Sequence, residues 1–153
     1  MAIEIERKYL VKGTEWRGLV EPIQYVQGYL LVDEQRTVRV RITGNSGFLT
    51  IKGKSLGMGR KEFEYQIPLE DARELLQLRI TSLIEKKRSS IEWEGKFWEV
   101  DEFEGKNRGL ILAEIELKSE NEIFAIPPWI GEEVTDDIRY YNSYLSQNPY
   151  TEW

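Results

Sequence analysis

The sequence predicts a predominantly β protein of the α+β class, with about eight antiparallel strands and few helices. Most of the chain alternates apolar and charged residues with a period of two, which is typical of strands with two different faces. Most of the segments between these runs are too short for the crossovers of a parallel sheet. Because a sheet of this size tends to curl or close, we expect a barrel that forms one domain over residues 1–153.

The alternating runs predict strands, and glycine- and asparagine-rich signals separate them. We expect strands over 2–11, 24–32, 36–42, 48–54, 60–67, 81–92, 96–103 and 109–119. The cluster 43–47 (TGNSG) predicts a tight turn, so the third and fourth strands should form a hairpin.

Three segments have a different pattern. Pro68 and the leucines that follow it at helical spacing predict a helix over 68–78. The prolines at 127–128 are expected to end the sheet, and a terminal helix is expected over 134–146 with Thr135 as its N-cap. A short helical connection is expected over 14–20.

The composition excludes several kinds of chemistry. The chain has no Cys and no His, which removes disulfides, a Cys nucleophile, a Ser-His-Asp triad and a typical zinc site. A metal would have to be held by oxygen ligands. The net charge of −6 disfavours a nucleic-acid partner. No apolar run approaches the ~20 residues of a membrane span, and the first residues do not resemble a signal peptide, so no membrane partner and a cytoplasmic location are expected.

The charged faces of the predicted strands are segregated by sign. Most of these residues form pairs of like charge two positions apart, so both members leave a strand on the same side. The acidic members are Glu4, Glu6, Glu62, Glu64, Asp101, Glu114 and Glu116, and the basic members are Lys8, Arg39, Arg41, Lys52, Lys54, Lys86 and Arg88. The simpler interpretation is that these faces are solvated on the outside of the sheet.

The alternative is that the charged faces point into the closed sheet and line a polar tunnel. Such a tunnel is costly unless its charges are paired or hold an ion or ligand. Acidic side chains in one sector suit Mg²⁺ or Mn²⁺, and basic side chains in another suit a polyanion such as a triphosphate. This arrangement would point to metal-assisted phosphoryl chemistry.

The charged pairs also occur within longer motifs, which follow one another along nearly the whole chain. The chain opens with Glu4-Ile5-Glu6-Arg7-Lys8, an E-x-E-x-K motif. Further motifs are Gln27-Gly28-Tyr29-Leu30, Arg36-Thr-Val-Arg39-Val-Arg41, Leu49-Thr-Ile-Lys52, Arg60-Lys-Glu62-Phe-Glu64, Lys86-Lys87-Arg88, Trp98-Glu-Val-Asp101-Glu-Phe103-Glu-Gly105, Leu112-Ala-Glu114-Ile-Glu116-Leu117 and the tail 134–142. In this order the motifs resemble those of the CYTH, or triphosphate tunnel metalloenzyme, family.

The resemblance implies an eight-stranded antiparallel tunnel and hydrolysis of tripolyphosphate, nucleoside triphosphates or thiamine triphosphate, or cyclisation of ATP, with Mg²⁺ or Mn²⁺. Carried over by position, the metal-binding residues would be Glu4, Glu6, Glu114 and Glu116, supported by Glu62, Glu64 and Asp101 as ligands, water-positioning groups or partners of the bases. The phosphates would be held by Arg39, Arg41, Lys52, Lys86 and Arg88. Lys54 is inward by alternation, and the resemblance gives it no role.

Three residues complete the expected site. Lys8 could contact the scissile phosphate, and its alternative role is an internal salt bridge to Glu4 or Glu6. Tyr29 is expected either as a catalytic residue or as ordinary barrel packing. Arg139 could reach the tunnel and bind substrate from the terminal helix, or it could be a surface charge. We expect Lys8, Tyr29, Glu114 and Glu116 to be the catalytic residues.

The expected function is metal-dependent hydrolysis of a triphosphate, most of all of inorganic tripolyphosphate to pyrophosphate and phosphate. A class IV-type adenylate cyclase, a nucleoside triphosphatase and a thiamine triphosphatase remain open alternatives. A polyphosphate- or nucleotide-binding module without catalysis is the alternative outside enzymes. The expected partner is therefore a small triphosphate, and a homodimer is left open.

Overall fold

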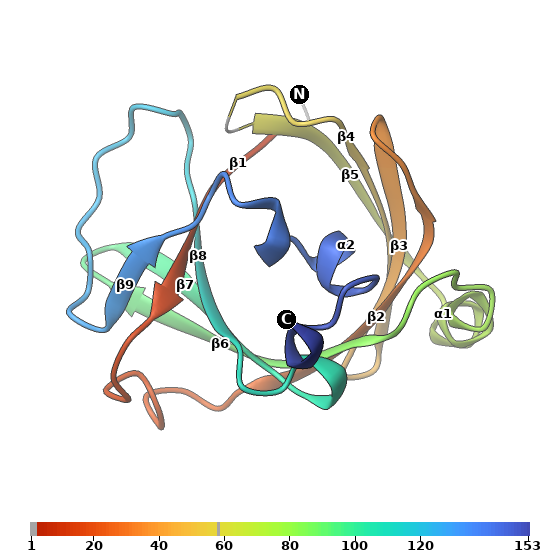
Figure 1. Cartoon of the computed structure of the whole chain (residues 1–153), viewed down its shortest axis with the longest axis horizontal. Coiled ribbons are helices and arrows are strands. Elements are labelled where there is room, and N and C mark those ends of the chain that lie inside the picture. The colour runs from red at the N-terminus through yellow and green to blue at the C-terminus, as the bar shows by residue number, and fades with distance from the viewer. Residues whose placement is uncertain (1–2, 58) are drawn as a thin grey trace.

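Eight antiparallel strands form a closed ring in the computed structural model, which describes residues 3–57 and 59–153 (Figure 1). The order around the ring is β5-β4-β3-β2-β6-β7-β8-β1, and β5 closes it by pairing with β1, where Arg60 lies opposite Glu4. The strands are β1 (Ile3–Val11), β2 (Ile23–Val32), β3 (Arg36–Thr43), β4 (Ser46–Gly53), β5 (Gly59–Ile67), β6 (Ile84–Trp93), β7 (Lys96–Phe103) and β8 (Ile111–Glu116). The closed antiparallel barrel predicted from the sequence is confirmed.

The helical elements are short. They are α1 (Leu69–Leu76), α2 (Asn142–Leu145) and the 3₁₀ helices η1 (Gly105–Asn107), η2 (Ile138–Tyr140) and η3 (Tyr150–Glu152). The expected hairpin is present, because Gly44 and Asn45 alone join β3 to β4 and Gly44 takes a positive φ of 57°. This conformation suits a glycine at the first central position of a tight hairpin turn. In the described part of the chain no helix is long and apolar enough to cross a membrane.

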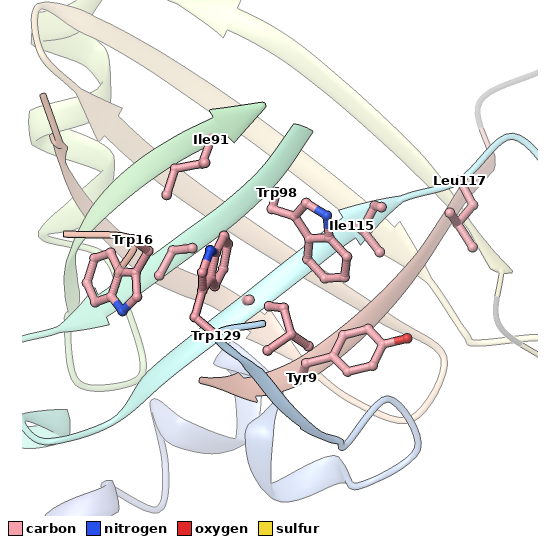
Figure 2. Close-up of a cluster of buried hydrophobic side chains, with 10 residues drawn as sticks. Tyr9, Trp16, Ile91, Trp98, Ile115, Leu117 and Trp129 are labelled. Atoms are coloured by element: carbon pink, nitrogen blue, oxygen red, sulfur yellow. The ribbon is translucent and has the colours of Figure 1, made fainter. Parts of the chain in front are cut away.

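The outer face of the barrel is covered by two apolar cores. Figure 2 shows the larger one, in which Trp98 on β7 packs against Tyr9 on β1, with ring centroids 5.4 Å apart, and against Trp129, at 6.4 Å. Trp16 and Ile115 belong to the same cluster. The smaller core lies under α1, where Ala72 and Leu76 cover Val40 of β3. Since side chains alternate along a strand, burying these residues outside turns their charged neighbours inward.

A third apolar cluster fills one end of the barrel from within. It contains Ile84, Phe103 and Leu112, which alternation places on the same side as the charged residues of their strands, and Leu145 of α2, which is fully buried. In Figure 1 the C-terminal segment, drawn in blue, lies within the outline of the ring. The chain therefore closes one end of its own barrel.

The structure differs from the sequence prediction in three elements. The segment 14–20 forms turns instead of a helix, and its Trp16 is buried in the core. The prolines at 127–128 do not end the sheet, since a ninth strand, β9 (Ile130–Glu133), pairs with β1. Gly131 favours this pairing, because a Cβ there would lie only 3.1 Å from the carbonyl oxygen of Leu10.

The predicted helix over 134–146 is wrong in its first half. The backbone N–H of Val134 donates to the carbonyl of Lys8, and the N–H of Lys8 donates to Oγ1 of Thr135. Thr135 therefore binds strand β1 instead of capping a helix. Asp137 caps η2 by accepting from the N–H of Arg139, and regular helix begins only at Asn142. At the other terminus, Ala2 of the first predicted strand lies outside the described residues.

Candidate active site

The interior of the barrel holds a cavity of about 270 Å³ with an almost entirely charged lining. Seven acidic and seven basic side chains contribute to it. Thirteen of the fifteen site residues predicted from the sequence line it: Glu4, Glu6, Lys8, Tyr29, Arg39, Arg41, Lys52, Glu62, Glu64, Lys86, Arg88, Glu114 and Glu116. The charged faces of these strands therefore point inward, and the simpler interpretation of an outer solvated face is wrong for them.

Acidic and basic residues occupy opposite halves of the ring. The neighbouring strands β7, β8, β1 and β5 supply all seven acidic side chains of the cavity. The other four neighbours, β4, β3, β2 and β6, supply Lys52, Arg39, Arg41, Lys86 and Arg88. Two cations stand on the acidic half, Lys8 on β1 and Arg60 on β5. The segregation of charge along the sequence thus becomes a segregation of charge in space.

Ion pairs join the two halves. Nζ of Lys52 lies 2.9 Å from Oε1 of Glu4 and 3.2 Å from Oε2 of Glu62. Arg41 donates to Glu64 at 2.9 Å. Each of these contacts crosses between strands, so the carboxylates hold long cationic side chains extended into the cavity.

Asp101 lies behind the cavity wall. Its side chain is 1% exposed, and its two oxygens accept from Nε and NH2 of Arg88 at 2.7 and 2.8 Å and from Nζ of Lys86 at 2.8 Å. Burial alone would raise the pKa of Asp101, but Arg88 and Lys86 outweigh it and lower the pKa. Of the roles expected for Asp101, this position fits that of a partner of the bases best.

Two predicted inward residues lie elsewhere. Arg139 is more than half exposed, forms an ion pair with Asp137 at 2.7 Å and does not line the cavity. The helix that was to carry it inward does not form. Lys54 is exposed, because β4 ends at Gly53 and the alternation of the strand ends with it.

Lys8 is held by the C-terminal segment. Its Nζ donates to the carbonyl oxygen of Tyr140 at 3.0 Å, lies 3.6 Å from Oε1 of Glu114 and is 5.2 Å from the ring centroid of Tyr141. The expected internal salt bridge therefore exists, but to Glu114 instead of Glu4 or Glu6. Tyr29 is 4% exposed, lines the cavity and lies opposite Arg39 in the β2–β3 pair.

Several lining residues were missed from the sequence. Thr37 and Glu99 alternate with predicted residues of their strands, and Arg60 begins the R-x-E-x-E motif, so a strict reading of alternation and motif would have found them. Tyr141 and Asn142 lay in the tail motif 134–142 without a predicted role, and Ser143 lay in no motif. They reach the cavity only because the terminal segment folds back into the barrel.

Several carboxylates of the acidic half ionise less readily than an ordinary glutamate. Burial, together with Glu114 and Glu4, raises the pKa of Glu6 to about 7. Burial also raises the pKa of Glu116, of Glu62 and of Glu99, in each case with help from neighbouring carboxylates. Within residues 3–57 and 59–153 no three of these carboxylates already converge as a metal site. Their chemistry fits Mg²⁺ or Mn²⁺ nonetheless, since both prefer oxygen donors and would reduce the repulsion between neighbouring carboxylates.

A closed antiparallel barrel with an acidic and a basic interior half defines a class of tunnel proteins suited to anions with many charges. The chain belongs to the CYTH domain family, whose model matches residues 2–144. This agrees with the resemblance found in the motifs.

Similar proteins support the same family. The chain is 49% identical over 151 residues to an inorganic triphosphatase of Acetivibrio thermocellus, covering 98% of this chain and 97% of the relative. It is 37% identical over 147 residues to an inorganic triphosphatase of Nitrosomonas europaea, covering 94% and 96%. The crystal structure of the inorganic triphosphatase NE1496 superposes with a TM-score of 0.68 at 36% identity, covering 93% of this chain and 96% of that chain.

Proposed function

We propose that the protein is a divalent-metal-dependent triphosphatase that hydrolyses inorganic tripolyphosphate to pyrophosphate and phosphate. The observation that carries the proposal is the division of the barrel interior into an acidic and a basic half. A binding module for polyphosphate would need the basic half only. The two relatives named inorganic triphosphatase, each covered over more than nine tenths of its length, support the choice of substrate.

The basic half would bind and orient the substrate. Arg39, Arg41, Lys52, Lys86 and Arg88 would donate to phosphate oxygens, and guanidinium groups suit these oxygens because they donate in pairs. Nε of Arg39 and Nε of Arg41 are buried without a hydrogen-bond partner among the described residues. Lys8, on the opposite wall, would contact the scissile phosphate and stabilise the charge that develops there.

The acidic half would hold the metal and the attacking water. Glu4, Glu6, Glu114 and Glu116 would bind Mg²⁺ or Mn²⁺, with Glu62 and Glu64 completing the acidic set, and the bound metal supplies charge neutralisation of the triphosphate. A carboxylate of this half would orient the water that attacks a terminal phosphorus. The leaving pyrophosphate would stay bound to the cations of the basic half until it is released.

Tyr29 would support the substrate-binding groups, since it stands opposite Arg39 at the cavity wall. Asp101 would hold Lys86 and Arg88 in place. Arg139 is not part of the proposed site, because its side chain pairs with Asp137 away from the cavity. The cytoplasmic location and the homodimer stay predictions.

The test is product analysis on tripolyphosphate and ATP, each with Mg²⁺ and with Mn²⁺. The proposal predicts equal amounts of phosphate and pyrophosphate from tripolyphosphate, released faster than phosphate from ATP. Cyclic AMP from ATP would replace the proposal with a cyclase, and release from ATP alone would replace it with a nucleotidase. Binding of tripolyphosphate without turnover under either metal would leave a binding module.

A further inference from the structure

The C-terminal segment contributes directly to the wall of the cavity. Tyr141, Asn142 and Ser143 line it together with the charged residues of the strands. Among them, Asn142 contacts one of the basic side chains: its Oδ1 accepts from Nζ of Lys86 at 3.3 Å. The two residues lie 56 positions apart in the sequence.

Lys86 is enclosed on several sides. Its side chain is 2% exposed, and its Nζ lies 5.9 Å from the ring centroid of Tyr25 and 5.5 Å from that of Phe103. Nζ donates to Asp101 at 2.8 Å and to Asn142 at 3.3 Å. An ammonium group has three donor hydrogens, so one remains for the cavity that Lys86 lines.

The two acceptors of Lys86 differ in an important way. Asp101 is charged and also accepts two hydrogen bonds from Arg88, so it draws the ammonium group towards the wall and offsets its charge. Asn142 is neutral and stands on the segment that closes the barrel. A neutral acceptor fixes the direction of an ammonium group and leaves its charge available for a phosphate.

Asn142 is itself held firmly. It is the first residue of α2, whose Leu145 is fully buried in the cluster at the closed end of the barrel. The N–H of Leu145 donates to the carbonyl of Tyr141, and the N–H of Ser82 donates to the carbonyl of Ser146. These contacts set the position of the amide by packing, so its oxygen provides a fixed point for the lysine.

We propose that Asn142 is a positioning residue, whose amide oxygen orients Lys86 towards a phosphate group of the substrate. The inference rests on the proposed function in that it takes a triphosphate as the ligand of the cavity. It adds a residue of the terminal segment to a site otherwise built from strands.

The first test is the affinity for tripolyphosphate in the presence of a chelator, measured by calorimetry on the full chain. Asn142→Leu removes the acceptor at similar size, and we expect the dissociation constant to rise about 10-fold, the effect of roughly one lost charge-assisted contact. Asn148→Leu, on the exposed end of the same segment, is the matched control and should bind like the wild type. If Asn142→Leu lowers the melting temperature strongly, Asn142→Ala takes its place.

A double-mutant cycle separates positioning from a general structural effect. In the background of Lys86→Met, we expect Asn142→Leu to change the dissociation constant by less than about 2-fold, because the residue it positions is absent. The same 10-fold loss in both backgrounds, or no loss in the wild-type background, would overturn the inference. A wild-type protein that binds tripolyphosphate but never hydrolyses it with Mg²⁺ or Mn²⁺ would refute the proposed function and leave this cycle to decide the inference alone.

Discussion

Two carboxylates in the acidic half ionise very differently although they stand on paired strands. Burial favours the neutral form of Glu114, but Lys8, Arg88 and Lys86 outweigh it and hold its pKa well below the usual range. Burial and the charge of Glu114 raise the pKa of Glu6 to about 7. The neighbouring cations therefore keep Glu114 ionised, whereas burial and the neighbouring anion favour the protonated form of Glu6.

The pKa of Glu6 predicts a pH-dependent cost to the metal-free protein. The pKa is about 7 in the folded state against 4.5 for an ordinary Glu, so the folded state binds the proton more tightly than the unfolded state. With a chelator present, Glu6→Gln should therefore gain stability over the wild type as pH rises from about 4.5 to above 7. Urea unfolding across this range measures the difference. Glu132→Gln, on the exposed part of β9, is the control, and a constant difference for Glu6→Gln would contradict the assignment.

A substitution at Glu114 tests its role in catalysis separately from its effect on stability. Replacing it with Gln removes a proposed metal ligand, so turnover of tripolyphosphate should fall by about 100-fold or more. The fold should survive, because Arg88 keeps its two contacts with Asp101 and Lys8 keeps the carbonyl of Tyr140. Melting temperature and phosphate release measure the two effects, with Glu92→Gln, an exposed residue near the end of β6, as the control. Wild-type activity in Glu114→Gln would refute its role.

At the scale of residues, alternation and motif predicted the cavity well. They placed both members of Glu114/Glu116 and of Lys86/Arg88 inward, because alternation puts the two members of each pair on the same face of their strand. They failed at Lys54, which lies just past the end of its strand. They included Asn142 in the tail motif 134–142 but gave it no role, since its role depends on a contact with a residue 56 positions away.

At the scale of elements, α1 packs closely on β4 through a glycine. A Cβ at Gly47 would lie 2.6 Å from Cβ of Ala72, and the backbone of the helix would have to shift. Gly47→Ala should therefore lower the free energy of unfolding by about 1–3 kcal/mol.

Gly53, in the same strand, is the matched control for this prediction. A Cβ there would meet nothing closer than Cβ of Lys61 at 3.7 Å, so Gly53→Ala should leave stability almost unchanged. Urea unfolding of both variants gives the comparison. Equal losses of stability at the two positions would show that the close approach of α1 is not the reason why a side chain at residue 47 is unfavourable.

The same scale shows why two elements were predicted wrongly. The strand β9 is four residues long and follows two prolines, so no periodic pattern predicts it. It forms because Ile130 packs in the outer core and the edge of β1 is free beyond β5. The segment after β9 has helical periodicity, but Val134 and Thr135 bind the backbone of Lys8, and this long-range pairing replaces the first helical turns.

At the scale of the whole molecule, the net charge does not describe the interior of the closed barrel. The chain carries −6 overall, yet half of the ring presents cations to the interior, where low exposure and low dielectric strengthen each charge. The sequence could predict closure because eight alternating strands leave two edges that pair with each other. The resemblance of the tail 134–142 places it near one end of the tunnel, but the sequence could not predict that the segment fills that end, because Leu145 joins Ile84 and Leu112 only after the ring exists.

The central claim is that the acidic half serves a metal and the basic half a triphosphate in one reaction. The most direct measurement is the rate of phosphate release from tripolyphosphate by the wild-type protein, first with a chelator and then with added Mg²⁺ or Mn²⁺. The account predicts negligible release with the chelator and rapid release once either metal is in excess. Equally fast release with the chelator would contradict it, because the acidic half would then have no metal to hold.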